Sequence, residues 1–98
     1  MGWVTDALRE LKAGRPAQVC PIGGSMRGRI ESGQQVTISP VNAADVQVDD
    51  VVFVAWKGGY LLHLVKQVAA DKLLIGNNVG KINGWVTRNA IIGRVNDA

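Results

Sequence analysis

One serine of this chain stands in a glycine-rich segment that favours chemistry at its hydroxyl group. Gly23 and Gly24 precede Ser25, and Gly28 follows three residues later. Glycines let the backbone turn sharply and leave room for a substrate carbonyl beside the hydroxyl. The backbone N–H groups of Ser25 and Gly23 could then hold a developing oxyanion. Ser25 is therefore a candidate nucleophile, although Gly-Ser pairs also occur as simple turns.

The candidate base for this serine is His63, the only histidine of the chain. It lies in an apolar run over residues 60–68 that is rich in strand-forming types. Residues alternate between the two faces of a strand, so His63 would share a face with Leu61 and Val65. A neutral imidazole, with an ordinary pKa near ~6.5, can accept a hydroxyl proton, and activity should fall at about pH 6 to 7. The competing interpretation is a core histidine whose ring nitrogens bond the backbone.

Other chemistry finds less support in the composition. The single cysteine, Cys20, can form no internal disulfide and is expected to be a small buried residue in a strand. One cysteine, one histidine and 8 scattered acidic residues do not favour a zinc site, so no metal is predicted. The glycines match neither a phosphate-binding loop nor a dinucleotide fingerprint. No cofactor is therefore predicted.

The elements that would position these residues form one small domain over residues 1–98. Apolar residues at helical spacing predict an amphipathic helix over residues 3–12, within an N-terminal segment 1–14. A β core is expected over residues 17–95, with hairpin turns at Gly58-Gly59 and Ala70-Asp71. The expected fold is mainly β, a bent antiparallel barrel-like sheet with one short N-terminal helix. Its strands are predicted over residues 17–20, 35–39, 51–57, 60–69, 72–76, 84–87 and 90–95.

The hydropathy of the chain and its N-terminal sequence indicate where in the cell the protein is expected. The longest uncharged apolar run, residues 51–56, is far shorter than the ~20 residues of a membrane span. The N-terminus lacks the basic start and apolar region of a signal peptide. These features predict a soluble, cytoplasmic protein without a transmembrane segment.

A set of short blocks, in order along the chain, resembles a clan of serine peptidases. This clan contains the type I signal peptidases and the self-cleaving repressors of the LexA kind. The resemblance implies the same bent β fold and cleavage of a peptide bond, in this chain or in another polypeptide. The blocks are Gly24-Ser25-Met26, Ile30 with Gly33, Val36-Thr37-Ile38, Val48-Asp49-Asp50-Val51-Val52, His63-Leu64-Val65, Gly76-Asn77-Asn78 and Ile92-Gly93-Arg94-Val95.

The resemblance also assigns roles to single residues. It makes Ser25 the nucleophile and Met26 the methionine that follows it. His63 falls where most members have a lysine base, which is similar to signal peptidases of the endoplasmic reticulum and archaea. Gly23 stands where one branch has an additional serine of the oxyanion hole, so only backbone donors remain here. The aspartate that orients the histidine in such members has no clear counterpart, and Asn83 is the candidate.

Two departures from the clan pattern and one peptide bond matter for activity. The Gly-Asp before the central strand is Asp49-Asp50 here, and the Gly-Asp-Asn block is Gly76-Asn77-Asn78. Because these acidic blocks are altered, a second interpretation is a catalytically degenerate domain that binds a partner without cleaving it. Repressors of this kind cleave an Ala-Gly or Cys-Gly bond in their own chain, and Ala13-Gly14 is such a bond, although Gly14 is more simply a helix C-cap.

The excess of basic over acidic residues supports a competing functional class, a nucleic-acid-binding module. The net charge is +3 and the pI is 9.4, and Trp56, Tyr60 and Trp85 could stack on bases. The basic residues are spread without a cluster, and Arg27 next to Ser25 could equally contact a bound peptide. The sequence leaves a homodimer open. The candidate phosphate contacts are Arg15, Arg27, Arg29, Lys57, Lys81, Arg88 and Arg94.

Overall fold

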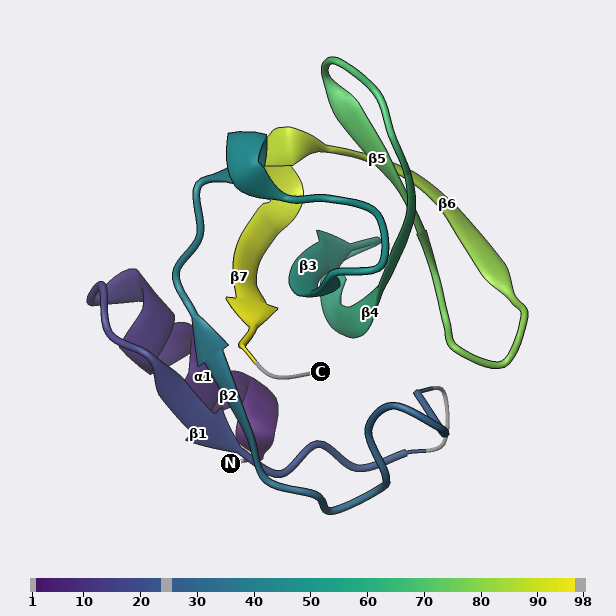
Figure 1. The fold of residues 1–98 in the computed structure, drawn as a ribbon. Coiled ribbons are helices and arrows are strands. Elements are labelled where there is room, and N and C mark those ends of the chain that lie inside the picture. Colours follow the sequence, from purple (N-terminus) through teal and green to yellow (C-terminus); the bar gives the residue numbers. More distant parts are fainter. Residues whose placement is uncertain (1, 24–25, 97–98) are drawn as a thin grey trace.

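Seven strands form a single antiparallel sheet in the order β1-β2-β7-β3-β4-β5-β6 (Figure 1). The computed structural model describes residues 2–23 and 26–96, so Gly24 and Ser25 lie outside the described residues. The first element is the helix α1 (Trp3–Lys12), and two short 3-10 helices, η1 (Ala43–Asp45) and η2 (Arg88–Ala90), lie between strands. The strands are β1 (Ala17–Val19), β2 (Val36–Ser39), β3 (Val51–Trp56), β4 (Gly59–Val68), β5 (Lys72–Gly76), β6 (Ile82–Thr87) and β7 (Ile91–Val95).

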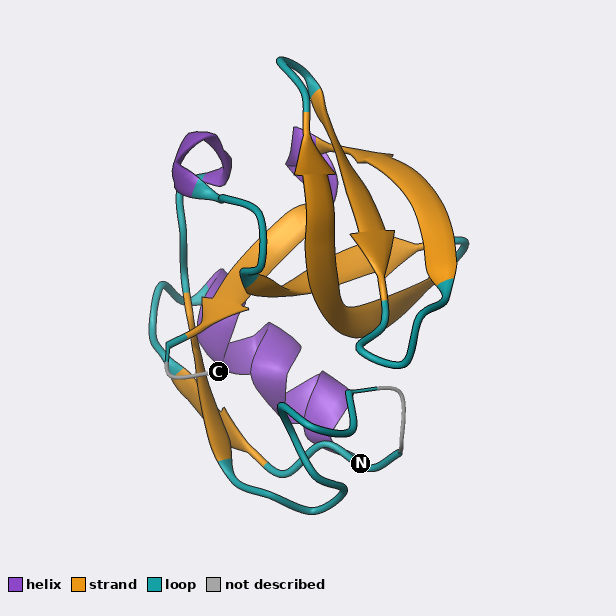
Figure 2. Cartoon of the chain, turned by 45° about the vertical axis from the view of Figure 1, so that its right-hand side comes forward, coloured by secondary structure: helices purple, strands orange, loops and turns teal. Residues whose placement is uncertain are grey.

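The sheet curves without closing. Figure 2 shows the strong bend of the strands, with α1 lying beside the sheet. The edge strands are β1 and β6, and within the described ranges no pairing joins them. The predicted class, mainly β and antiparallel with one short helix, is therefore confirmed, and the sheet is an open one.

The local elements follow the sequence pattern closely. The helix over residues 3–12 and the strand over residues 72–76 have the predicted bounds. The β3–β4 turn lies one residue earlier than predicted, at Lys57-Gly58, because Gly59 pairs with Trp56 as the first residue of β4. Both turn residues have positive φ, 46° and 81°, which suits the tight hairpins that match strand twist. The two 3-10 helices were not predicted.

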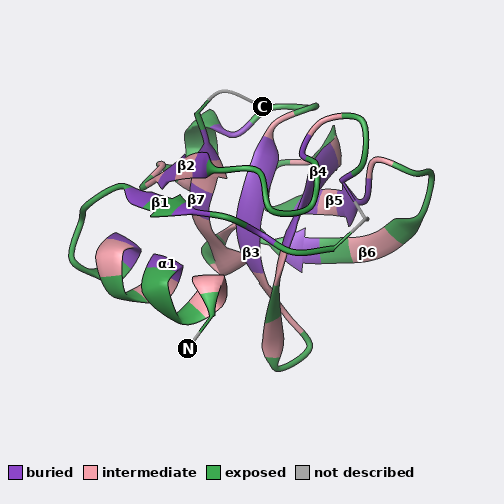
Figure 3. Ribbon diagram, turned by 90° about the horizontal axis from the view of Figure 1, so that it is seen from below, coloured by how far each residue is buried: buried purple, intermediate pink, exposed green. Residues whose placement is uncertain are grey.

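Two apolar clusters lie on opposite faces of the sheet. On β3, Val51 and Phe53 belong to one cluster, while Val52 and Val54 belong to the other, as alternation along a strand requires. Figure 3 shows β3 as the buried centre of the molecule. The same alternation on β4 confirms the predicted faces. The face with Leu62 and Leu64 packs toward α1, and the face with Leu61 and Val65 packs in the second cluster.

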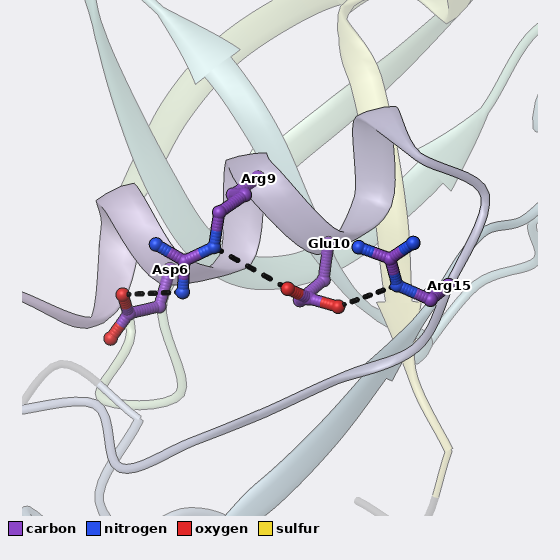
Figure 4. A network of polar contacts seen from close by, with 4 residues as sticks. All are labelled: Asp6, Arg9, Glu10 and Arg15. Atoms are coloured by element: carbon purple, nitrogen blue, oxygen red, sulfur yellow. Dashed lines mark hydrogen bonds and ion pairs between the residues drawn. The ribbon is translucent and has the colours of Figure 1, made fainter.

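The helix α1 covers the first cluster with one face and leaves the other to solvent. Ala7 and Leu11 are buried, and the ring of Trp3 lies 5.5 Å from that of Phe53. On the outer face Arg9 contacts both Asp6, at 3.0 Å, and Glu10, and Arg15 contacts Glu10 at 2.8 Å (Figure 4). The hydrogen bond from Arg15 lowers the pKa of the Glu10 carboxyl below its usual value. None of the helices among the described residues has the length and apolarity needed to cross a membrane.

The end of α1 also holds the Ala13-Gly14 bond. Gly14 has φ +80°, and its N–H donates to the carbonyl of Leu11 at 3.1 Å. The Arg15 N–H donates to the carbonyl of Glu10 at 2.9 Å. This bond is therefore folded into a helix C-cap, at the end of the helix far from Trp3.

Candidate functional site

A hollow of about 190 Å³ lies where the β1–β2 connection meets β4 and the first turn of α1. Its wall includes Trp3 of α1, the segment Tyr60–His63 of β4, and Gly23 and Met26 of the connection. Gly23 and Met26 are the described residues on either side of Gly24-Ser25. The structure therefore brings the two flanks of the candidate nucleophile to the same hollow as the candidate base. Ser25 itself lies outside the described residues.

The imidazole of His63 is held by the backbone of its own strand. His63 is only 7% exposed, and its Nδ1 lies 2.6 Å from the carbonyl oxygen of Leu62. A carbonyl oxygen can only accept, so Nδ1 must carry the proton and donate it. Nε2 then keeps its lone pair. This is the tautomer that a general base for a serine hydroxyl needs.

Burial keeps this imidazole neutral. Burial lowers the pKa of His63 below its ordinary value, the hydrogen bond to Leu62 opposes the change, and the positive charge of Lys81 adds to the lowering. A reaction that required neutral His63 would therefore slow at a lower pH than the value of about 6 to 7 predicted from the sequence. Near neutral pH His63 is available to accept a proton.

The same lowered pKa makes the stability of the fold depend on pH. The unfolded chain binds the proton of His63 at about pH 6.5, whereas the folded chain binds it only at lower pH. Stability contributed by the neutral imidazole is thus complete above about pH 6.5 and is lost as the pH falls through the folded pKa. We expect the free energy of unfolding, measured with urea, to fall by up to about 1.4 kcal/mol per pH unit in that window. The variant His63→Asn should show no such slope between pH 7 and 5, and equal slopes in the two proteins would contradict this assignment.

Gly23, the second predicted oxyanion donor, already has a partner. Its N–H donates to the Oγ of Ser32 at 3.1 Å. Close by, the N–H of Gly33 donates to the carbonyl of Pro21 at 2.8 Å. These two bonds join the outgoing and returning arms of the β1–β2 connection. The N–H of Gly23 can serve an oxyanion only if it leaves Ser32.

The two predicted substrate contacts lie in different places of the same loop. Met26 is buried in the first apolar cluster and also lines the hollow, and its carbonyl accepts from the N–H of Ile30 at 2.8 Å. Arg27 is exposed and lines a second hollow of about 350 Å³, together with Glu31 and Ser32. Met26 is thus an anchor of the loop as well as part of the wall.

A pair of asparagines fixes the loop against the β5–β6 turn. The side-chain oxygen of Asn77 accepts from the N–H groups of Val79 and Lys81, at 3.0 and 2.9 Å, which shapes that turn. Asn78 then donates from Nδ2 to the carbonyl of Arg27 at 2.7 Å. The Gly-Asn-Asn block therefore holds the β1–β2 connection at Arg27, although it carries no carboxylate.

Gly28 allows this close approach. It has φ +96°, and a Cβ added there would lie 2.9 Å from Nδ2 of Asn78. We expect Gly28→Ala to destabilise the protein by about 1–3 kcal/mol, measured by urea unfolding, because the backbone and the contact both oppose it. Gly33→Ala is the matched control, since Gly33 has φ +84° but nothing within 4 Å of the added atom. Equal losses in the two variants would show that the contact with Asn78 does not matter.

Asn83, the predicted partner of the base, lies on β6 at the irregularity between β5 and β6. The orienting contact of His63 is instead the Leu62 carbonyl. Among the described residues, no hydrogen bond joins His63 to Asn83. The Oδ1 of Asn83 is buried without a hydrogen-bond partner among those residues. A backbone carbonyl does here what the sequence assigned to a side chain.

Several contacts of the site were missed in the sequence. The Leu62 carbonyl carries no signal of its own, because every residue has one. Ser32 and Trp3 reach the site only through the fold. The block that contains Asn78 was recognised, and its amide could have been expected to bond a nearby backbone group.

The other polar residues test the alternative chemistry considered above, namely a reactive cysteine, a metal site and phosphate binding. Cys20 is exposed, which corrects the expectation of a buried residue, because it follows β1 at the outward position after the buried Val19. The described residues contain no group of three or more His, Cys, Asp or Glu side chains able to hold a metal ion. Several arginines expected to be free for phosphates have partners within the protein, namely Arg15 with Glu10, Arg29 with Asp49, Arg88 with carbonyls of Ala43, Ala69 and Ala70, and Arg94 with Asp50.

The site therefore combines a neutral, backbone-oriented histidine with the two flanks of a glycine-framed serine, around one hollow. Comparison of the chain with protein-family models, with curated proteins and with solved structures finds no match.

Proposed function

We propose that this domain is a serine peptidase in which Ser25 and His63 form a catalytic dyad. The Oγ of Ser25 attacks a peptide carbonyl while Nε2 of His63 takes its proton. The imidazolium then gives that proton to the leaving amine, and an acyl-enzyme remains. A water molecule, deprotonated by the same nitrogen, hydrolyses the acyl-enzyme and restores the serine. The N–H of Ser25 stabilises the oxyanion, and that of Gly23 can join it only on leaving Ser32.

One observation carries this proposal. The only histidine of the chain lines the same hollow as Gly23 and Met26, and its Nδ1 contact leaves Nε2 as the basic nitrogen. Burial alone lowers the pKa of a core histidine too, so the place of His63 in the same wall as Gly23 and Met26 carries the argument. The resemblance to the LexA and signal peptidase clan implies a barrel-like sheet, and the sheet of this chain shares the antiparallel order but is open. The exposed thiol of Cys20 suits a reducing compartment, so we place this activity in the cytoplasm.

Labelling with a fluorophosphonate probe tests the nucleophile. Such a probe forms a covalent bond with an activated serine, so we expect wild-type protein to be labelled at neutral pH, with the adduct mapped to Ser25. Ser25→Ala should lose the label entirely. Ser39→Ala, which removes a serine of β2, is the matched control and should be labelled like the wild type. Undiminished labelling of Ser25→Ala would overturn the assignment.

A binding module for single-stranded nucleic acid is the second candidate. Trp85 on the edge strand β6 is 44% exposed, and Nζ of Lys72 lies 5.2 Å from its ring centroid. An exposed aromatic ring beside a cation can stack on a base next to a phosphate. Salt-dependent binding of an oligonucleotide that Trp85→Ala removes, with no probe labelling of Ser25, would favour this candidate.

A further inference from the structure

The hollow beside His63 has a mostly apolar wall and an apolar rim. Trp3, Met26, Ile30 and Leu61 contribute to it. At its mouth, the side chain of Ile22 is 74% exposed. A bound apolar group would cover this side chain and gain the free energy of burying its surface.

The size of the hollow limits what can enter. Its volume is about 190 Å³. An apolar cavity of about 150 Å³ accepts a benzene molecule, so this hollow has room for one leucine- or phenylalanine-sized side chain. The methyl group of an alanine would leave most of this hollow unfilled, so an alanine should not bind there in preference.

The charge at the rim adds a second element of recognition. Glu31 is the only charged side chain among the described residues that line the hollow, since His63 is neutral. Its Oε2 accepts from the N–H of Gly28 at 2.9 Å, and the residue is exposed. A carboxylate fixed in this way can pair with a cation on a bound peptide.

We propose that this hollow binds one large apolar side chain of a polypeptide substrate, with a lysine or arginine of that substrate at a neighbouring position paired to Glu31. As a substrate site, it rests on the proposed peptidase function. As a peptide-binding site, it can be measured without any cleavage. Ile22 and Glu31 are then specificity-determining residues of the domain.

The test is peptide binding to the Ser25→Ala protein, measured by calorimetry, so that no peptide is consumed. The probes are capped hexapeptides with leucine, phenylalanine or alanine at one central position and arginine or glutamate beside it, in either order. We expect leucine or phenylalanine to bind about ten- to fiftyfold more tightly than alanine. Arginine beside it should bind about two- to fivefold more tightly than glutamate. Equal affinities for leucine, phenylalanine and alanine peptides would overturn the proposal.

Matched variants locate the binding to the hollow. Ile22→Ala should weaken the leucine peptide about three- to tenfold, whereas Ile82→Ala, at an exposed isoleucine of β6, should leave the affinity unchanged. Glu31→Gln keeps an acceptor for Gly28 and should remove only the preference for arginine. Asp71→Asn, on the β4–β5 turn, is its control and should keep that preference. An equal effect of Ile22→Ala and Ile82→Ala would contradict the proposed place of binding.

The outcomes separate this proposal from the peptidase function. If the probe labels Ser25 but the peptides bind alike, the peptidase function stands and the specificity is wrong. If the apolar preference depends on Ile22 but Ser25 is never labelled, the hollow is a peptide site in a domain without catalysis.

Discussion

Replacing His63 by asparagine is expected to lower the rate of peptide hydrolysis by about a hundred- to ten-thousandfold while leaving the protein folded. The asparagine amide nitrogen can take the place of Nδ1 and donate to the Leu62 carbonyl. It has no basic nitrogen in place of Nε2, so the Ser25 hydroxyl keeps its proton. The measurement is the cleavage rate of a fluorogenic peptide with a leucine next to an arginine.

Thermal unfolding of His63→Asn at neutral pH is the control, because a low rate in an unfolded protein would have no bearing on the base. His63→Gln provides a second variant, with an amide near the position of Nε2 and again no base. An undiminished rate in either folded variant would show that His63 takes no part in the reaction.

Replacing Phe53 by alanine is expected to cost about 3–5 kcal/mol of the free energy of unfolding. Phe53 is fully buried on the central strand β3, and its ring centroid lies 5.5 Å from those of Trp3 and Tyr60. Removing the ring leaves a cavity under both residues, and both line the hollow. Folded domains of this size have about 5–15 kcal/mol in total, so much of the stability would be lost. Urea unfolding monitored by circular dichroism measures the change.

Two further variants show whether the loss of stability comes from the cavity left by the buried ring. Phe53→Leu refills most of the space and should cost about 1.5 kcal/mol or less. Trp85→Ala removes a larger ring from an exposed site and should cost clearly less than Phe53→Ala. A cost for Phe53→Ala no larger than that for Trp85→Ala would mean that the ring of Phe53 does not support Trp3 and Tyr60 at the hollow.

Local patterns made much of the fold predictable from the sequence. The α1 helix has its apolar residues at helical spacing and is followed by Gly14 two residues after its end, so its bounds follow from neighbouring residues alone. The alternation around His63 correctly assigned the faces of β4, because a single period decides it. The β3–β4 turn was displaced by one residue. The two glycines favoured a turn made of both, but Gly59 pairs with Trp56, so the turn consists of Lys57 and Gly58.

The contacts that form the site could not be predicted in the same way. The Leu62 carbonyl binds His63 because of the side-chain rotation that the surroundings allow, and no residue type signals this. Asn78 contacts Arg27 across a separation of 51 residues, which depends on the whole curvature of the sheet. Cys20 resembled a strand residue, but β1 ends one residue before it. Sequence patterns thus predicted the helix and the strands more reliably than the contacts between their atoms.

The pH dependence of Ser25 labelling by the fluorophosphonate probe tests the central claim most directly, because it measures the activation of the serine itself. Rates would be measured from pH 8 to pH 4 in the wild type and in His63→Asn, with circular dichroism confirming the fold at each pH. We predict that the wild-type rate falls about tenfold per pH unit below a midpoint lower than the ordinary histidine pKa, and that His63→Asn reacts slowly at every pH. A wild-type rate that is flat over this range, or equal to that of His63→Asn, would contradict the account.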